Sequence, residues 1–198
     1  MTHKPLVVYP DADGDEEELY PSQFAHIRHI ADLKVYHGQP ESNQDYVDRI
    51  KDAQGILLGW DLPGEVMRQA LDLEVISFTG IGVSKFVDMD QAQNRHITVC
   101  NCPGYSNSTV AEHTMALLLS LCRDVPNLDR HTRNGLWKSE STAIELRGKN
   151  IGLIGFGGIG QQFSQLCKAF GMDVFVWTRS MNLEYTTQFG VRLCSLGC

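Results

Sequence analysis

The sequence predicts an α/β fold, in which helices cover parallel sheets. Short apolar runs rich in Val, Ile and Leu alternate with segments that have the composition of helices. These runs are apolar on both faces, as strands are when they lie between two layers of helices. Of the 198 residues, 42% are hydrophobic and 21% are charged, which is typical of a folded globular chain.

The first half of the chain, residues 1–102, is expected to form one flavodoxin-like unit. Its predicted strands are residues 6–9, 33–37, 55–59, 74–80 and 96–101. Its predicted helices are about residues 22–31, 45–53, 64–71 and 87–94. The acidic run at residues 11–18 lacks the glycine and glutamate spacing of a calcium loop, so we expect a solvated loop that leads into a helix.

A Pro-Gly pair ends this pattern, and residues 103–198 are expected to form a second unit. A long helix is predicted at about residues 109–124, with Ser108 as its N-cap. This helix is apolar nearly all round, so we expect it to be buried on most sides, between domains or between subunits. A polar link over residues 130–150 leads to the next strand.

A glycine-rich turn follows that link. Residues 149–154 form a predicted strand, and Gly-Phe-Gly-Gly-Ile-Gly comes directly after it at residues 155–160. A predicted helix at residues 161–170 and a second strand at residues 173–177 complete the segment. The order strand, glycine turn, helix, strand is typical of the first half of a Rossmann dinucleotide-binding domain.

Each glycine of this turn has a predicted role. Gly155 allows the tight turn, Gly157 lets a pyrophosphate approach the backbone, and Gly160 lets the helix pack close to the strand. Gly158 and Ile159 belong to the same turn, and the N-terminus of the helix that follows presents N–H groups and a partial positive charge to the phosphates. The alternative is an ordinary strand-to-helix turn. We therefore predict these residues to bind NAD(P).

The end of the second strand bears on the choice of dinucleotide. An acidic residue there would accept hydrogen bonds from the ribose 2′-OH of NAD. The sequence has Thr178, Arg179 and Ser180 at this point, and Asp173 is at the other end of the strand. Because Arg179 could pair with a 2′-phosphate, NADP is slightly favoured. The alternative is a solvated loop arginine, which leaves NAD usable.

Composition argues against several other classes of protein. A formal net charge of -7 is unfavourable for binding the phosphate backbone of nucleic acid. The longest apolar run, residues 115–122, is far shorter than the roughly 20 residues that span a bilayer. The N-terminus has no signal-peptide pattern, so a cytoplasmic location is expected. The six cysteines include no C-x-x-C pair, and no metal site is expected.

Three more segments match one known family in order, over about residues 76–180. These are FTGIGVSKFVDMDQAQNRHITVCNCPGYSNSTVAEHTMALLLSL, RNGLW and ELRGKNIGLIGFGGIG. With them the sequence resembles the D-isomer-specific 2-hydroxyacid dehydrogenases, which include glyoxylate, hydroxypyruvate and glycerate reductases. The resemblance implies that a nicotinamide cofactor passes hydride to a small 2-oxo acid, giving a D-2-hydroxy acid, and that the first unit is the substrate domain.

The resemblance also implies roles for single residues. The backbone N–H groups of Ile81 and Gly82 map to the loop that holds the substrate carboxylate. Ser106 maps to a position near the substrate where many members have Asn, and in this chain Asn107 comes next. Val110 maps to a position near the nicotinamide.

The family's catalytic residues have no counterpart in this sequence. The resemblance implies an Arg, an acid and a His well after the second nucleotide strand, beyond Cys198. We therefore expect a C-terminally truncated chain that is inactive alone. The resemblance further implies a homodimer through the helix from Thr109. The alternative function is a non-catalytic dinucleotide-binding sensor or scaffold.

Overall fold

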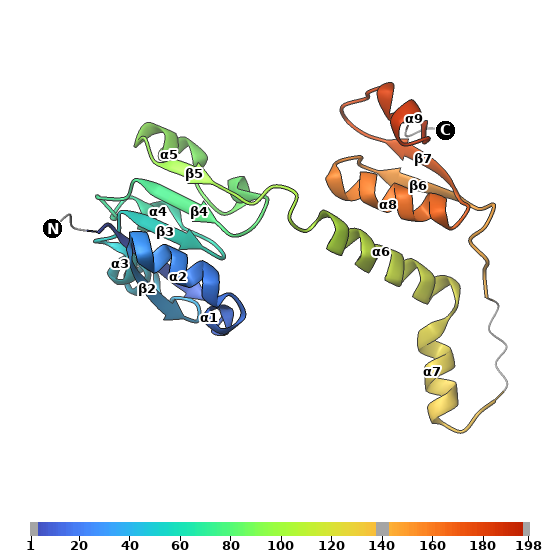
Figure 1. Ribbon diagram of the computed structural model, residues 1–198, viewed down its shortest axis with the longest axis horizontal. Coiled ribbons are helices and arrows are strands. Elements are labelled where there is room, and N and C mark those ends of the chain that lie inside the picture. The colour runs from blue at the N-terminus through green and yellow to red at the C-terminus, as the bar shows by residue number, and fades with distance from the viewer. Residues whose placement is uncertain (1–3, 138–142, 196–198) are drawn as a thin grey trace. The chain divides into compact units, whose positions relative to one another are not determined.

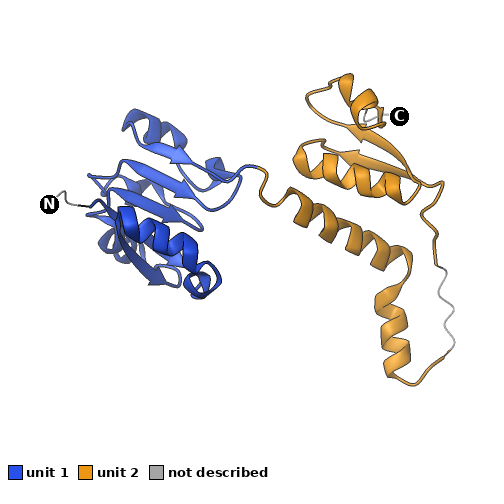
Figure 2. Ribbon diagram, viewed as in Figure 1, with its two compact units in different colours: residues 1–103 blue, residues 104–198 orange. Residues whose placement is uncertain are grey.

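A computed structural model describes residues 4–137 and 143–195 of the chain. It separates into two compact units, Met1–Pro103 and Gly104–Cys198 (Figure 2). None of the helices in the described ranges is long and apolar enough to cross a membrane.

Unit 1 contains a five-stranded parallel sheet with the order β2-β1-β3-β4-β5 (Figure 1). The strands are β1 (Leu6–Ala12), β2 (Asp32–His37), β3 (Gly55–Leu58), β4 (Val75–Phe78) and β5 (Thr98–Cys100). The helices are α1 (Glu16–Leu19), α2 (Pro21–Ile30), α3 (Asn43–Ile50), α4 (Gly64–Met67) and α5 (Met89–Asn94), with a 3-10 turn η1 (Val83–Lys85). This strand order confirms the predicted flavodoxin-like fold.

The apolar residues of unit 1 lie on both faces of this sheet. Val8 and Ile56 belong to the larger core, which α3, α4 and α5 cover. The neighbouring residues Tyr9 and Leu57 point to the other face and pack with Phe24 of α2. Since successive side chains of a strand point to opposite faces, continuous apolar strands are what a sheet covered on both faces needs.

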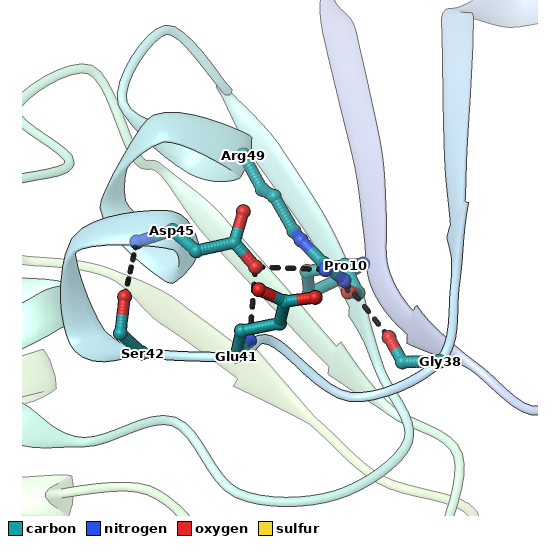
Figure 3. A network of polar contacts seen from close by, with 6 residues as sticks. All are labelled: Pro10, Gly38, Glu41, Ser42, Asp45 and Arg49. Carbon is teal, nitrogen blue, oxygen red and sulfur yellow. Dashed lines mark hydrogen bonds and ion pairs between the residues drawn. The ribbon is translucent and has the colours of Figure 1, made fainter.

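Arg49 fixes α3 against two strands (Figure 3). Its Nη1 donates hydrogen bonds to the carbonyl oxygens of Pro10, at 2.6 Å, and Gly38, at 2.8 Å. Its Nη2 lies 2.8 Å from a carboxylate oxygen of Asp45, and Ser42 caps the same helix by accepting from the backbone N–H of Asp45. Pro10 belongs to β1 and Gly38 follows β2, so this side chain connects α3 with the carboxyl ends of both strands.

Unit 2 contains three parallel strands in the order β6-β7-β8. They are β6 (Asn150–Ile154), β7 (Asp173–Trp177) and β8 (Arg192–Leu193). The helices are α6 (Asn107–Cys122), α7 (Val125–Arg133), α8 (Gly158–Ala169) and α9 (Glu184–Gln188). Strand β8 has only two residues, and residues 196–198 lie outside the described residues. Figure 1 shows α6 beside α8.

Two expectations about the helices of unit 2 are wrong. The long helix begins at Asn107 with Ser106 as its N-cap, and neither Ser106 nor the predicted cap Ser108 makes a side-chain capping bond. The start of the predicted polar link is part of α7, whose polar residues hid it from a reading based on apolar periodicity. Asp124, in a left-handed conformation with φ 51°, separates α7 from α6.

Within unit 2 by itself α6 is buried on one side only, and the burial expected between domains or between subunits stays a prediction. Only Ala111 and Met115 of this helix are buried. Leu117 is 59% exposed and Leu121 is 79% exposed. The helix presents one face to α8, and Leu118, Leu119 and Cys122 are partly buried against the same core. Leu117 and Leu121 stay largely uncovered within the described part of unit 2.

Candidate functional site

The glycine turn begins at the carboxyl end of β6, beside the carboxyl end of its paired strand β7. Ile154, the last residue of β6, is in register with Trp177, the last residue of β7. The backbone N–H of Gly155 donates to the carbonyl of Trp177 at 2.7 Å, which extends the pairing by one residue. The loops that follow the two strands therefore begin side by side.

Three glycines of this turn differ in what a side chain at their position would meet. Gly155 has φ +104°, a conformation that side chains rarely allow. A Cβ on Gly160 would lie 2.7 Å from the carbonyl oxygen of Gly155, closer than real Cβ atoms come. A Cβ on Gly157 would meet no protein atom within 4 Å. The first two glycines thus serve the turn itself, whereas Gly157 leaves open space beside the backbone.

The buried side chain of Phe156 anchors the turn to the core of unit 2. This side chain is buried and packs against the rings of Tyr185 and Phe189, with centroids 5.0 Å and 5.3 Å away. Its carbonyl accepts a hydrogen bond from the Gln161 side chain at 3.1 Å. The backbone on either side of Phe156 is therefore held in place while its glycine neighbours stay accessible.

Helix α8 starts directly after this anchor and offers an anion site. Gly157 is its N-cap, no side chain caps it, and its first turn contains no acidic residue. Gly158 and Ile159 are its first two residues, and Ile159 is partly exposed. Because the first N–H groups of a helix have no partner inside it, they and the helix dipole attract phosphate.

An open hollow of about 490 Å³ adjoins the turn. It is lined by residues 154–157 and 177–180, so the predicted Gly155, Gly157, Thr178, Arg179 and Ser180 meet around one space. No carboxylate is among its lining residues. Asp173 opens β7 at the opposite edge of the sheet and lies 3.4 Å from Arg192.

The other predicted residues of unit 2 lie at the start of α6. Ser106 precedes the helix, and its carbonyl accepts the backbone N–H of Val110 at 2.9 Å. The Val110 side chain is partly exposed, and its own carbonyl accepts a hydrogen bond from Thr114.

In unit 1, Ile81 and Gly82 lie in the loop after β4. The Ile81 carbonyl accepts a hydrogen bond from the Asn101 side chain at 2.6 Å, and the Gly80 carbonyl accepts one from the backbone N–H of Cys102 at 2.9 Å. Within the described ranges, the backbone N–H groups of Ile81 and Gly82 meet no protein acceptor. Both are therefore free to donate to an anionic group.

Asp11, near the carboxyl end of β1, is a residue that sequence reasoning missed. The expected solvated loop is wrong here, because β1 continues to Ala12 and carries Asp11 into the interior, where it is 1% exposed. Its carboxylate accepts the backbone N–H groups of Gly59, at 3.0 Å, and Trp60, at 2.7 Å. Burial raises the pKa of this carboxyl group. Asp11 thus fixes the loop after β3, from which the half-exposed Trp60 projects.

Comparisons with known proteins bear on this site. Residues 115–197 match the family model described as D-isomer specific 2-hydroxyacid dehydrogenase, NAD binding domain. A D-3-phosphoglycerate dehydrogenase of Archaeoglobus fulgidus is 38% identical over 130 residues, which are 65% of this chain and 24% of that protein. A glyoxylate reductase of Pyrococcus furiosus is 30% identical over 154 residues, 73% of this chain and 46% of that protein.

Solved structures agree with these matches. An acyclic imino acid reductase, Bsp5, in complex with NADPH and D-Arg has a TM-score of 0.82 and 26% identity. The match covers 96% of this chain and 60% of that one. The matches with these three proteins therefore cover from 24% to 60% of their lengths.

Proposed function

Because the chain belongs to the D-isomer-specific 2-hydroxyacid dehydrogenase family, we propose that it contributes to a nicotinamide-dinucleotide-dependent oxidoreductase. The proposed reaction is the reduction of small 2-oxo acids to D-2-hydroxy acids. When bound, the dinucleotide supplies the hydride for the carbonyl carbon.

The observation that carries this proposal is the open space at Gly157. The residues present fit the cofactor, because a Cβ at this position would fill the space that a pyrophosphate needs. The adjacent N-terminus of α8 has free N–H groups and no acidic residue to repel a phosphate. In this proposal Gly155 and Gly160 keep the turn tight, and the first residues of α8, Gly158 and Ile159, donate to the pyrophosphate.

The residues after β7 support a preference for NADP. Thr178, Arg179 and Ser180 line the same hollow, and they present a guanidinium and two hydroxyl groups where NAD enzymes have a carboxylate. A guanidinium can bind a 2′-phosphate through two parallel hydrogen bonds. We therefore propose that the chain binds NADPH more tightly than NADH.

The substrate is proposed to bind through unit 1. The free N–H groups of Ile81 and Gly82 suit a carboxylate, which is the group that all 2-oxo acids share. The resemblance adds Ser106 near the substrate and Val110 near the nicotinamide. It assigns no catalytic Arg, acid or His to residues 1–198, so turnover is proposed only for a polypeptide that also contains those residues, in the cytoplasm.

Helix α6 is proposed as the dimer contact of the enzyme. Its exposed Leu117 and Leu121 support this, because large apolar side chains gain stability when a partner covers them. The partner is a second copy of the chain.

Calorimetric titration of the chain with NADPH and with NADH tests the binding part of the proposal. We expect saturable binding, tighter for NADPH, and absence of binding to either would refute it. NADPH oxidation with glyoxylate or hydroxypyruvate, by this chain and by a polypeptide that also contains the catalytic residues implied by the resemblance, tests the reaction. Binding without any turnover would favour a dinucleotide sensor or scaffold.

A further inference from the structure

The first residues of two helices of unit 2 pack directly on each other. Asn107 begins α6 and Gly158 begins α8. A Cβ built on Gly158 would lie 2.7 Å from Cγ and 2.9 Å from Oδ1 of Asn107, and closer still to Nδ2. Real Cβ atoms do not come this close. The Asn107 amide therefore occupies the space that any side chain at position 158 would need.

The Asn107 amide packs against Gly158 and has no polar partner among the described residues. Across residues 4–137 and 143–195, no group accepts a hydrogen bond from its Nδ2 or donates one to its Oδ1. The residue is half-buried. An asparagine amide offers two donors. A donor that is fixed before its acceptor arrives loses little entropy on binding.

The amide also lies where an acceptor is expected. Gly158 is next to Gly157, whose Cβ position is open, and both belong to the N-terminus of α8. A pyrophosphate has only acceptor oxygens and a negative charge, so hydrogen bonds to it are of the stronger, charge-assisted kind. The backbone N–H groups of α8 approach such a ligand from one side, and the amide of Asn107 adds a donor from the start of α6.

We propose that Asn107 is a further cofactor-binding residue, whose Nδ2 donates a hydrogen bond to the dinucleotide pyrophosphate. The inference rests on the proposed function, since it needs a dinucleotide at the glycine turn. Gly158 has no positive φ, and its missing Cβ leaves room for the amide in the position that the structure shows.

The test compares two substitutions in the 198-residue chain. Asn107→Ala removes the donor and is expected to raise the Kd for NADPH about tenfold. Asn107→Asp keeps the shape but places a negative charge near the phosphates, and is expected to raise it about a hundredfold. Because an acidic residue in the first turn of a helix is stabilising, this variant should fold at least as well as wild type. If Asn107 acts only by packing, the order is reversed and Asp binds better than Ala.

Two controls make the result specific. Ser108→Asp adds the same charge one residue later on an exposed position and should leave the Kd for NADPH within about twofold. Adenosine 2′-monophosphate lacks the pyrophosphate, so its affinity should not change in either Asn107 variant. NADPH binding by Asn107→Asp within twofold of wild type would overturn this inference alone. Failure of the wild-type chain to bind NADPH would overturn the proposed function, and the inference with it.

Discussion

A methyl group at Gly157 should separate cofactor binding from folding. In Gly157→Ala the new Cβ meets no protein atom within 4 Å, and the backbone, at φ -74° and ψ -171°, suits alanine. Restricting the unfolded chain stabilises the variant by about 0.4–1 kcal/mol, and loss of glycine at an N-cap costs a similar amount. We therefore expect the free energy of unfolding to change by less than about 1 kcal/mol.

The same methyl group occupies the space proposed for the pyrophosphate. Overpacking of this size costs about 1–3 kcal/mol, which corresponds to a Kd for NADPH raised roughly 5- to 150-fold. Calorimetric titration with NADPH measures this change, and thermal unfolding of the same samples measures stability. Binding is expected to fall while the melting temperature stays within a few degrees of wild type.

Gly160→Ala is the matched control for this substitution. Its Cβ would lie 2.7 Å from the carbonyl oxygen of Gly155, so it should lower stability by about 1–3 kcal/mol. Two results would refute the reasoning. One is a Gly157→Ala variant that binds NADPH like wild type, and the other is one that is destabilised as much as Gly160→Ala.

Three other substitutions test single contacts. Arg49→Met keeps the stem but leaves the carbonyls of Pro10 and Gly38 without their donor, so urea unfolding should show a loss of about 1–3 kcal/mol, and an unchanged midpoint would contradict the network. Burial raises the pKa of Asp11 above its ordinary 3.8, so the folded state holds this proton more tightly than the unfolded state. Stability should therefore fall as pH rises from 3.8 through the raised pKa, and urea titrations from pH 3 to 7 should show a smaller fall for Asp11→Asn. Arg179→Ala should raise the Kd for NADPH about tenfold and leave NADH within twofold, whereas equal losses would remove its proposed role in choosing the cofactor.

Short-range features of this chain could be predicted from the sequence because their causes are local. The turn at Gly155 follows from an apolar strand that ends in a glycine, and the strand and helix beside it are adjacent in sequence. Predicted strands and helices of unit 1 are present with ends shifted by a few residues, since apolar runs mark their centres better than their ends.

Features that depend on distant partners could not be predicted. Asp11 looks like part of an acidic loop until β1 is seen to extend past it, and its acceptor role needs the N–H groups of residues 59–60. Arg49 likewise has the sequence context of an ordinary helix residue, and its two carbonyl partners lie on other elements. Apart from its place beside Ser106, nothing in the sequence indicates a role for Asn107, because its contact with Gly158 joins segments about fifty residues apart.

The proposed dinucleotide cradle, meaning β6, the glycine turn, α8 and β7, lies within residues 150–180. Because it is local, binding and turnover can be tested separately. Strand β6, the turn, α8 and β7 are consecutive, and their contacts with one another shape the hollow. In a complete Rossmann sheet the first strand lies inside, between the two halves. Here β6 is an edge strand of the described sheet, and its last residue, Ile154, is 80% exposed. A partner strand beside β6 would cover Ile154 without altering the paired edge with β7 where the dinucleotide is proposed to bind. Affinity for NADPH therefore reports on the local cradle, whereas reduction of a 2-oxo acid depends on groups that the cradle does not contain.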